Sequence, residues 1–163
     1  MESQKWFVQR KWEQIRDGAR LRQGSGEVNI FIQDVAPETD YCYAETNRRL
    51  GRMSEEHFGE YETFFRSLDW TIAPAPDLLV YLKASDEALL ARANESKREF
   101  ETVDDEYFLT MKQVNREWIA GVGENGDREY RILEINTDNF DFAHNEAAKN
   151  KLVEIVASNL EMI

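Results

Sequence analysis

Apolar residues recur along this chain with a helical period in some stretches and form short continuous runs in others. Residues 4–22 place apolar side chains three and four positions apart among charges, which predicts an amphipathic helix ending at a glycine-rich turn. Further helices are predicted at about 40–50, after Ser54, after Ser85, and over 105–120 and 145–162. Ser54 and Ser85 each precede an acidic pair, so both are expected to be N-caps of the helices that follow them.

Three apolar runs between these helices predict short strands, at Val28–Ile32, Leu78–Leu82 and 130–136. Strands of this kind that alternate with helices are typical of a parallel sheet covered by helices. We therefore predict an α/β fold. Because the chain has no internal repeat, low-complexity tract or long linker, residues 1–163 are expected to form a single domain.

Charge and cysteine content narrow the class of protein. The chain has 20 basic and 32 acidic residues and a net charge of −12, which argues against non-specific nucleic-acid binding because that binding needs a cationic face. The single cysteine, Cys42, rules out a disulfide framework, so a cytoplasmic location is expected. No apolar run approaches the roughly 18 residues that span a bilayer, so no membrane partner is expected.

Two features of the sequence resemble functional sites but predict neither a phosphate-binding loop nor a metal site. Gly121, Gly123 and Gly126 fit G-x-G-x-x-G, but the phosphate-binding version follows a strand and opens a helix. Here the motif follows a predicted helix and precedes a predicted strand, which favours a turn. His57 and His144 have no histidine or cysteine nearby at ligand spacing, so no metal site is predicted.

The charged stretch Arg92–Glu101 has two interpretations. In the first it is a solvated end of a helix. In the second it is a mobile lid whose guanidinium groups close over a polyphosphate and stabilise charge during phosphoryl transfer. The spacing of the charges by itself does not decide between them.

Five segments, taken in chain order, resemble the deoxynucleoside kinases, in particular the bacterial deoxyadenosine/deoxyguanosine kinase type. The first resembles the helix with the family's base-recognising glutamine, and the second the helix after its acid-Arg-Ser motif. The third resembles the family's fourth strand, the fourth lies where its arginine lid lies, and the fifth matches the loop that borders the adenine of ATP. The segments are SQKWF at 3–7 continuing to Gln14, YCYAE at 41–45 continuing to Gly51, PDLLVYLKAS at 76–85, Arg92–Glu101, and NTDNFDF at 136–142.

This resemblance implies roles for individual residues. Gln4 would pair with the edge of the nucleobase, Tyr43 would stack on the base, and Glu101 would accept a hydrogen bond from the sugar 3′-hydroxyl. Arg92 and Arg98 would be lid cations that face the phosphates. The residues that match the loop bordering the adenine are Asp138, Asn139 and Phe140.

The phosphate-binding parts of the family pattern are where this sequence departs from it. None of the eight glycines is followed by Lys-Ser or Lys-Thr, so these 163 residues contain no G-x-x-x-x-G-K-[ST] loop. The family's early general base is missing as well. Aligned without a gap, the family's acid-Arg-Ser motif falls on Gln33-Asp34-Val35, and with a gap it falls on Asp34-Val35-Ala36. Asp34 is therefore the candidate acid, and the arginine is absent. Ser96 occupies the middle lid position. The expected fold is therefore of the P-loop-kinase type without its first strand and loop.

Three functions compete at this point. The first is a deoxynucleoside kinase of nucleotide salvage, which would use ATP and Mg²⁺, act on a deoxyribonucleoside and be inactive as this chain alone. The second is a degenerate relative that serves as a nucleoside-binding, regulatory or structural subunit. The third is a remnant of the fold without a ligand. A homodimer or a partner chain carrying the P-loop is expected, and the candidate dimer surface is an aromatic helix face: Phe58, Tyr61, Phe64, Phe65 and Leu68.

Overall fold

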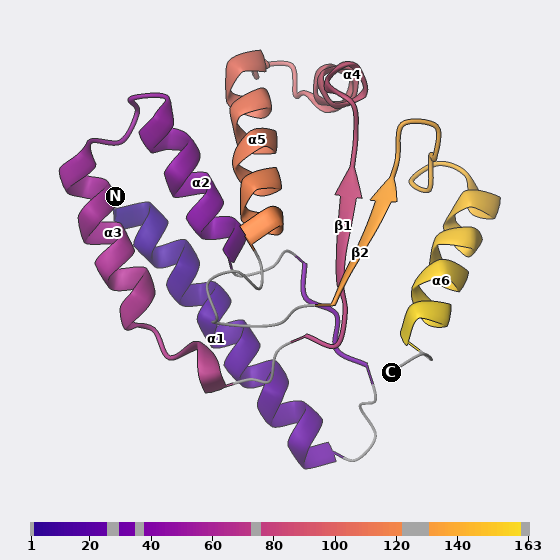
Figure 1. Cartoon of the computed structure of the whole chain (residues 1–163), viewed down its shortest axis with the longest axis horizontal. Coiled ribbons are helices and arrows are strands. Elements are labelled where there is room, and N and C mark those ends of the chain that lie inside the picture. The colour runs from indigo at the N-terminus through magenta and orange to yellow at the C-terminus, as the bar shows by residue number, and fades with distance from the viewer. Residues whose placement is uncertain (1, 26–29, 35–37, 73–75, 122–130, 161–163) are drawn as a thin grey trace. The chain divides into compact units, whose positions relative to one another are not determined.

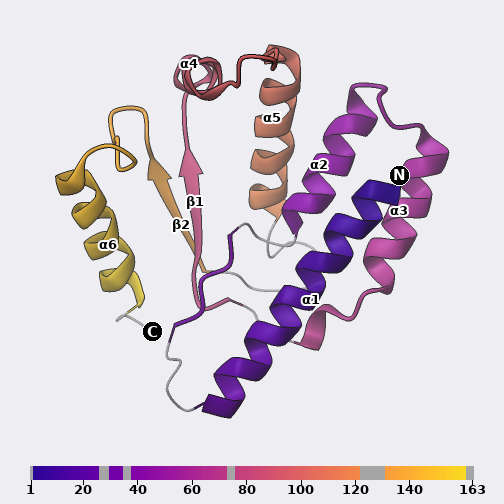
Figure 2. The same cartoon turned by 180° about the vertical axis from the view of Figure 1, so that it is seen from behind.

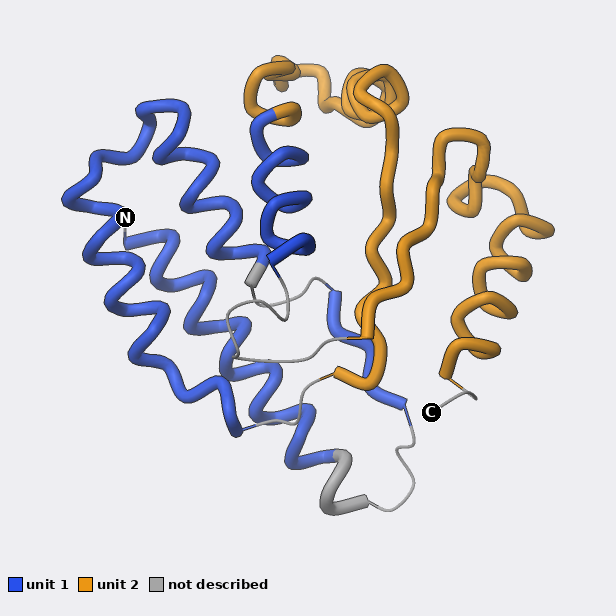
Figure 3. Tube along the Cα trace, in the orientation of Figure 1, with its two compact units in different colours: residues 1–75, 110–121 blue, residues 76–109, 122–163 orange. Residues whose placement is uncertain are grey.

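The structure is a computed structural model that describes residues 2–25, 30–34, 38–72, 76–121 and 131–160 (Figure 1). It divides into two compact units (Figure 3): residues 1–75 with 110–121, here the first unit, and residues 76–109 with 122–163, here the second unit. The elements, in chain order, are α1 (Glu2–Ser25), α2 (Glu38–Arg49), α3 (Glu55–Ser67), a 3₁₀ turn (Trp70–Ile72), β1 (Leu79–Lys83), α4 (Asp86–Ser96), α5 (Asp105–Gly121), β2 (Ile132–Asn136) and α6 (Glu146–Leu160).

The first unit is built on α1, α2 and α3, which lie side by side (Figure 2). Each helix contributes apolar side chains to one core, in which Val8, Ala44, Phe58 and Tyr61 are buried. Aromatic contacts extend this core, because the ring of Phe65 lies 5.0 Å from the ring of Trp70 and 6.1 Å from that of Tyr61. These residues hold the three helices together through one shared apolar cluster.

The aromatic face of α3 has a different role from the one the sequence suggested. Phe58 and Tyr61 are buried, and Phe64, Phe65 and Leu68 pack against the same core. An aromatic stripe at helical spacing is a core face when two other helices cover it. This face is therefore internal to the first unit and does not support the expected dimer surface.

Both predicted N-caps are confirmed. The Oγ of Ser54 accepts a hydrogen bond from the His57 N–H at 3.2 Å, and α3 begins at the next residue. The Oγ of Ser85 accepts from the Ala88 N–H at 3.1 Å, and α4 begins at the next residue. Each cap satisfies an N–H group that has no partner within the helix, which stabilises the helix by about 1 kcal/mol.

The second unit carries the sheet. Strands β1 and β2 pair in parallel, with Leu79 opposite Ile132 at one end and Lys83 opposite Asn136 at the other. Helix α4 follows β1 directly, and α6 follows β2 after a loop. The predicted α/β class with a parallel sheet is confirmed. Because parallel strands end at the same edge, the residues that follow Lys83 and Asn136 are neighbours in space.

The strand predicted at Val28–Ile32 is not observed. Its first two residues lie outside the described ones, and Ile30–Ile32 pair with no strand in the part of the chain that the structure describes. Ile30 and Ile32 are 68% and 83% exposed, while the ring of Phe31 lies against the backbone of Gly18 in α1. An apolar run becomes a strand only when a neighbouring strand takes its backbone hydrogen bonds, and here none does so.

Two other boundaries fall outside the described residues. Gly121 is the last residue of α5, and the rest of the glycine motif, 122–126, is not described. The final helix ends at Leu160, and the predicted positions 161–162 are not described either. No helix in the described part of the chain combines the length and apolar character needed to cross a membrane.

Candidate functional site

In the first unit, the structure places Gln4 against the start of α2. The Gln4 Nε2 donates a hydrogen bond to the main-chain oxygen of Asp40 at 3.4 Å. Lys11 lies on α1 seven residues after Gln4, hence about two helical turns further along the same face. Its Nζ lies 4.0 Å from Oδ2 of Asp40. Two side chains of α1 therefore converge on one residue of α2.

The carboxyl group of Asp40 is buried and only partly satisfied. Asp40 is 8% exposed, and its Oδ2 has no hydrogen-bond partner. Burial raises the pKa of Asp40 above its ordinary value, and the charge of Lys11 acts in the opposite direction. The hydroxyl of Tyr61 is also buried without a partner, and burial together with the nearby Asp40 raises its pKa. Buried polar atoms without a hydrogen bond are rare in native proteins, and these two oxygens are exceptions.

Tyr43 lies near this buried carboxylate. Tyr43 is 39% exposed on α2. Burial raises the pKa of its hydroxyl, and the charges of Asp40 and Asp34 raise it further. Gln4, Lys11 and Tyr43 thus lie around Asp40, and we name these four residues the Asp40 cluster.

Sequence reasoning missed Lys11 and Asp40. The available signal was the seven-residue step from Gln4 to Lys11, which puts both on one face of a helix. Nothing in the sequence indicated that Asp40 would be buried at that face, because burial depends on how α1 and α2 pack.

In the second unit, Thr137 ties together the residues that follow the two strands. Thr137 is 3% exposed, and its N–H and Oγ1 both donate to the main-chain oxygen of Lys83, at 2.8 Å and 2.9 Å. The Nη1 of Arg92 donates to the Oγ1 of Thr137 at 2.7 Å, and its Nη2 donates to the Thr137 main-chain oxygen. Arg92, predicted as a lid cation, thus contacts the end of the sheet.

Asp138 binds the N-terminus of α4. Its Oδ1 accepts the Ser85 N–H at 2.6 Å, and its own N–H donates to the Asn136 side chain at 2.8 Å. The hydrogen bond from the Ser85 N–H holds the pKa of Asp138 below its ordinary value, and the charge of Arg92 contributes in the same direction.

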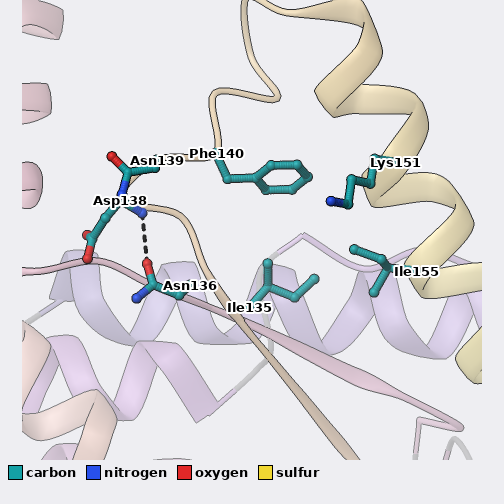
Figure 4. A pocket seen from close by; sticks show the side chains of 7 residues that line it. All are labelled: Ile135, Asn136, Asp138, Asn139, Phe140, Lys151 and Ile155. Atoms are coloured by element: carbon teal, nitrogen blue, oxygen red, sulfur yellow. Dashed lines mark hydrogen bonds between the residues drawn. The ribbon is translucent and has the colours of Figure 1, made fainter.

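A pocket of about 370 Å³ opens beside this loop (Figure 4). The aromatic ring of Phe140 and the side chain of Lys151 project into the same space above two apolar side chains, Ile135 and Ile155. Asp138, Asn139 and Phe140, the three residues predicted to border the adenine, all line it. The pocket combines a flat apolar wall with a few polar groups, which suits a heteroaromatic ring.

The charged stretch 92–101 is partly helical. Helix α4 continues to Ser96, so the first half belongs to a helix, and a turn follows in which the Glu101 N–H donates to the Arg98 oxygen at 2.9 Å. The Arg98 N–H donates to the Glu101 carboxylate at 3.0 Å, and both side chains are exposed. Arg98 and Glu101 therefore contact each other, whereas their proposed contacts with phosphate and sugar stay predictions.

Within the described residues, no three His, Cys, Asp or Glu side chains gather in an arrangement that could hold a metal ion. His144 lies beside Asp141, with its Nδ1 3.1 Å from Oδ1.

Comparison with known proteins identifies the family. A family model described as deoxynucleoside kinase matches residues 8–161. The chain belongs to the deoxynucleoside kinase family. Among curated proteins it is similar to the deoxyadenosine/deoxycytidine kinase of Bacillus subtilis (strain 168), with 26% identity over 131 residues. The alignment covers 78% of this chain and 58% of that protein, so the chain spans less than two thirds of the relative's length.

Solved structures of this family have the same fold. The chain is similar to deoxyadenosine kinase from M. mycoides with the products dCMP and a flexible dCDP bound, with a TM-score of 0.65, 15% identity, and coverage of 98% of this chain and 76% of that one. A second structure of that enzyme, with dATP bound, gives a TM-score of 0.61 and 13% identity, covering 94% of this chain and 76% of that one. The helix-rich arrangement with a small parallel sheet is therefore that of a deoxynucleoside kinase.

Proposed function

We propose that this chain supplies the nucleoside-binding part of a deoxynucleoside kinase, together with the pocket beside the base of the phosphate donor. The reaction of such an enzyme transfers the γ-phosphate of ATP to the 5′-hydroxyl of a deoxyribonucleoside. One observation carries the proposal: two side chains of α1, Gln4 and Lys11, converge on Asp40 at the start of α2, in a chain of this family. The similar structures of deoxyadenosine kinase from M. mycoides, one with dCMP and dCDP bound and the other with dATP, support it.

The Asp40 cluster has the chemistry that a nucleobase requires. The Gln4 amide offers a donor and an acceptor side by side, and the Asp40 oxygen accepts from an exocyclic amine or a ring N–H. Lys11 donates to a ring nitrogen or a carbonyl. Tyr43, with part of its ring exposed, supplies a face on which a base can stack. We propose Asp34 as the acid of the family's motif and Glu101 as the acceptor for the sugar 3′-hydroxyl.

The pocket beside Phe140 is proposed to take the adenine of ATP. Its aromatic wall provides stacking, and the side chains of Asn139 and Asp138 provide polar contacts at the rim. Lys151 places a positive charge at the same pocket, which favours an anionic nucleotide over a neutral nucleoside.

Phosphoryl transfer needs more cationic and backbone groups than this chain contains. Catalysis of this kind rests on positioning the γ-phosphate and neutralising its charge, and one missing arginine of the finger type costs about 10³–10⁵ in rate. The family pattern leaves at most Arg92 and Arg98 as lid cations, and these 163 residues contain no G-x-x-x-x-G-K-[ST] loop. None of the described residues is assigned to the Mg²⁺ that accompanies ATP in the family, because no suitable cluster exists among them. We therefore propose that this chain alone is inactive and works with a partner chain that carries the P-loop.

A second candidate function is a nucleoside-binding regulatory or structural subunit. The observation that favours it is that the buried Asp40 cluster is intact in a sequence without the phosphate loop. Both candidates require nucleoside binding, and they differ in whether a P-loop-bearing fragment restores turnover.

Calorimetry with deoxyadenosine, deoxyguanosine, deoxycytidine and thymidine tests the shared requirement. We expect binding of at least one nucleoside, and a loss of roughly 5- to 150-fold in affinity for Gln4→Ala, because a base edge would lose its buried partner. Gln14→Ala, at an exposed position on the same helix, is the matched control and should bind like the parent. Equal binding by Gln4→Ala and the parent would show that Gln4 does not read the base. A parent that binds none of the four would contradict the proposed function.

Turnover is tested separately with ATP and the same four nucleosides. We expect no conversion above background by the purified chain. A rate in the usual kinase range of about 1–100 s⁻¹ would refute the proposed inactivity. Activity restored by a P-loop-bearing fragment would support the kinase over the regulatory subunit.

A further inference from the structure

The guanidinium of Arg92 is engaged with the protein itself. It donates from Nη1 to the Thr137 hydroxyl at 2.7 Å and from Nη2 to the Thr137 main-chain oxygen. Two parallel donors on one planar group match two acceptors on one residue, a geometry that an arginine makes and a lysine does not. Two of the five N–H donors of this guanidinium are thereby engaged with Thr137.

Thr137 anchors the loop after β2 through its hydrogen bonds. Its N–H and hydroxyl donate to Lys83 at the end of β1, and its main-chain oxygen accepts the N–H of Phe140 at 3.1 Å. The turn that carries the Phe140 ring therefore begins at the same carbonyl group that Arg92 holds. A change at Arg92 acts on this turn without touching the pocket residues directly.

Helix α4 reaches the loop at two points. Its N-cap, Ser85, donates its N–H to Asp138, and Arg92 lies seven residues later, about two turns along the same face. The two contacts go to neighbouring residues of the loop, Asp138 and Thr137. Through them, the helix that leads into Arg98 and Glu101 fixes the conformation of the loop beside the pocket.

We propose that Arg92 is a positioning residue for the base-binding pocket, because the two hydrogen bonds from its guanidinium to Thr137 fix the turn that holds the Phe140 ring at the pocket. The role of phosphate-facing lid cation then belongs to Arg98, whose exposed guanidinium contacts Glu101. The ligand part of this proposal rests on the proposed function, because it takes the pocket beside Phe140 to be the site of the donor base. The part that concerns the loop stands on the hydrogen bonds alone.

Amide hydrogen exchange measured by NMR tests the loop. In Arg92→Gln, the amides of Thr137, Asp138 and Phe140 should exchange about tenfold faster or more, since a hydrogen bond from a charged group contributes about that factor. The Leu79 amide, which donates to Arg131 at the far end of the strands, should be unchanged. Arg98→Gln is the matched control and should leave all four amides as in the parent.

Coupling to Thr137 gives a second test of the same contact. Thr137→Val removes the hydroxyl at nearly constant volume, whereas Thr137→Ser keeps it. The effects of Arg92→Gln and Thr137→Val on the Phe140 amide should be non-additive, because they share one interaction. Thr137→Ser should behave like the parent. Arg92→Lys should restore less than half of the lost protection, because an ammonium lacks the fork. Unchanged exchange in Arg92→Gln, or full additivity, would overturn the proposal.

Ligand titrations distinguish a positioning role of Arg92 from direct contact with phosphate. ATP and inorganic tripolyphosphate are titrated into the parent, Arg92→Gln and Arg98→Gln. A positioning residue predicts that Arg92→Gln weakens binding of ATP at least fivefold and leaves tripolyphosphate unchanged, whereas Arg98→Gln weakens both. Equal losses for the two probes in Arg92→Gln would make Arg92 a phosphate contact and overturn the assignment. A parent that shows the exchange effect but binds neither probe would contradict the proposed donor site and support the loop role of Arg92.

Discussion

Glu45 on α2 should contribute more to stability than any exposed acid of the same network. Its side chain is 11% exposed and accepts three hydrogen bonds, from Nε and Nη2 of Arg48 at 2.7 and 2.8 Å and from Nε of Arg49 at 2.7 Å. The Nη1 of Arg48 also donates a hydrogen bond to the carboxylate of Glu55 in α3 at 2.9 Å, and the Nη2 of Arg49 donates to the carboxylate of Glu117 in α5 at 2.7 Å. One buried carboxylate thus joins three helices of the first unit through two arginines.

The size of the effect follows from the burial of the partners. Removing one member of a fully buried ion pair costs about 3–5 kcal/mol because the remaining charge is unpaired. Here Arg48 and Arg49 are 30% and 36% exposed and keep their outer carboxylates, so water and those partners offset part of the loss. We expect Glu45→Gln to lower the free energy of unfolding by about 2–3 kcal/mol, which shifts Tm by roughly 4–12 °C for a chain of this size.

Urea unfolding and thermal melting at pH 7 measure this change. The matched control is Glu55→Gln, whose carboxylate pairs with the same Arg48 but is 79% exposed, so its loss should stay below about 1 kcal/mol. If Glu45→Gln destabilises the protein no more than Glu55→Gln does, burial does not set the strength of this network and the reasoning is wrong.

The stability gap between parent and Glu45→Gln should also depend on pH. The hydrogen bond from Arg48 lowers the pKa of Glu45 below its ordinary value of 4.5, with a further contribution from Arg49. A carboxyl whose pKa is lower in the folded state stabilises the fold above its unfolded pKa, and this contribution is lost as the pH falls through the folded value. The gap should therefore be constant from pH 8 to about 5 and shrink below about pH 4.

Three further substitutions test other features of the fold by the same unfolding measurements. Ser85→Ala removes the N-cap of α4 and should cost about 0.5–2 kcal/mol, and no loss would show that the cap contributes nothing. Gly18→Ala puts a Cβ 2.4 Å from the Phe31 ring, so this substitution should be neutral or destabilising in the parent. In the Phe31→Ala background it should instead stabilise the protein by up to about 1 kcal/mol. Equal effects in both backgrounds would contradict the contact. Tyr61→Phe deletes a buried hydroxyl without a partner and should leave stability unchanged or raise it by up to about 1 kcal/mol, while a loss above 1 kcal/mol would reveal a bridging water.

The sequence by itself determined the elements that depend on local chemistry. The helical spacing of apolar residues predicted the helices that the structure contains, and Ser54 and Ser85 marked the first residues of two of them. Both strands in the described residues overlap predicted runs: Leu79–Lys83 is shifted by one residue from the run at Leu78–Leu82, and Ile132–Asn136 lies within the run at 130–136. Local spacing and caps are sufficient here because a helix forms its hydrogen bonds within one segment.

Only the tertiary structure decided which residues meet. The run at Ile30–Ile32 is apolar like the two strands, yet it pairs with no strand among the residues that the structure describes, and strand formation requires a partner distant in sequence. Asp40 contacts Lys11, which lies 29 positions away in the sequence. Arg92 donates hydrogen bonds to Thr137, which lies 45 positions away. No local pattern encodes such contacts, because they arise from the packing of one helix on another element and from the burial that this packing produces.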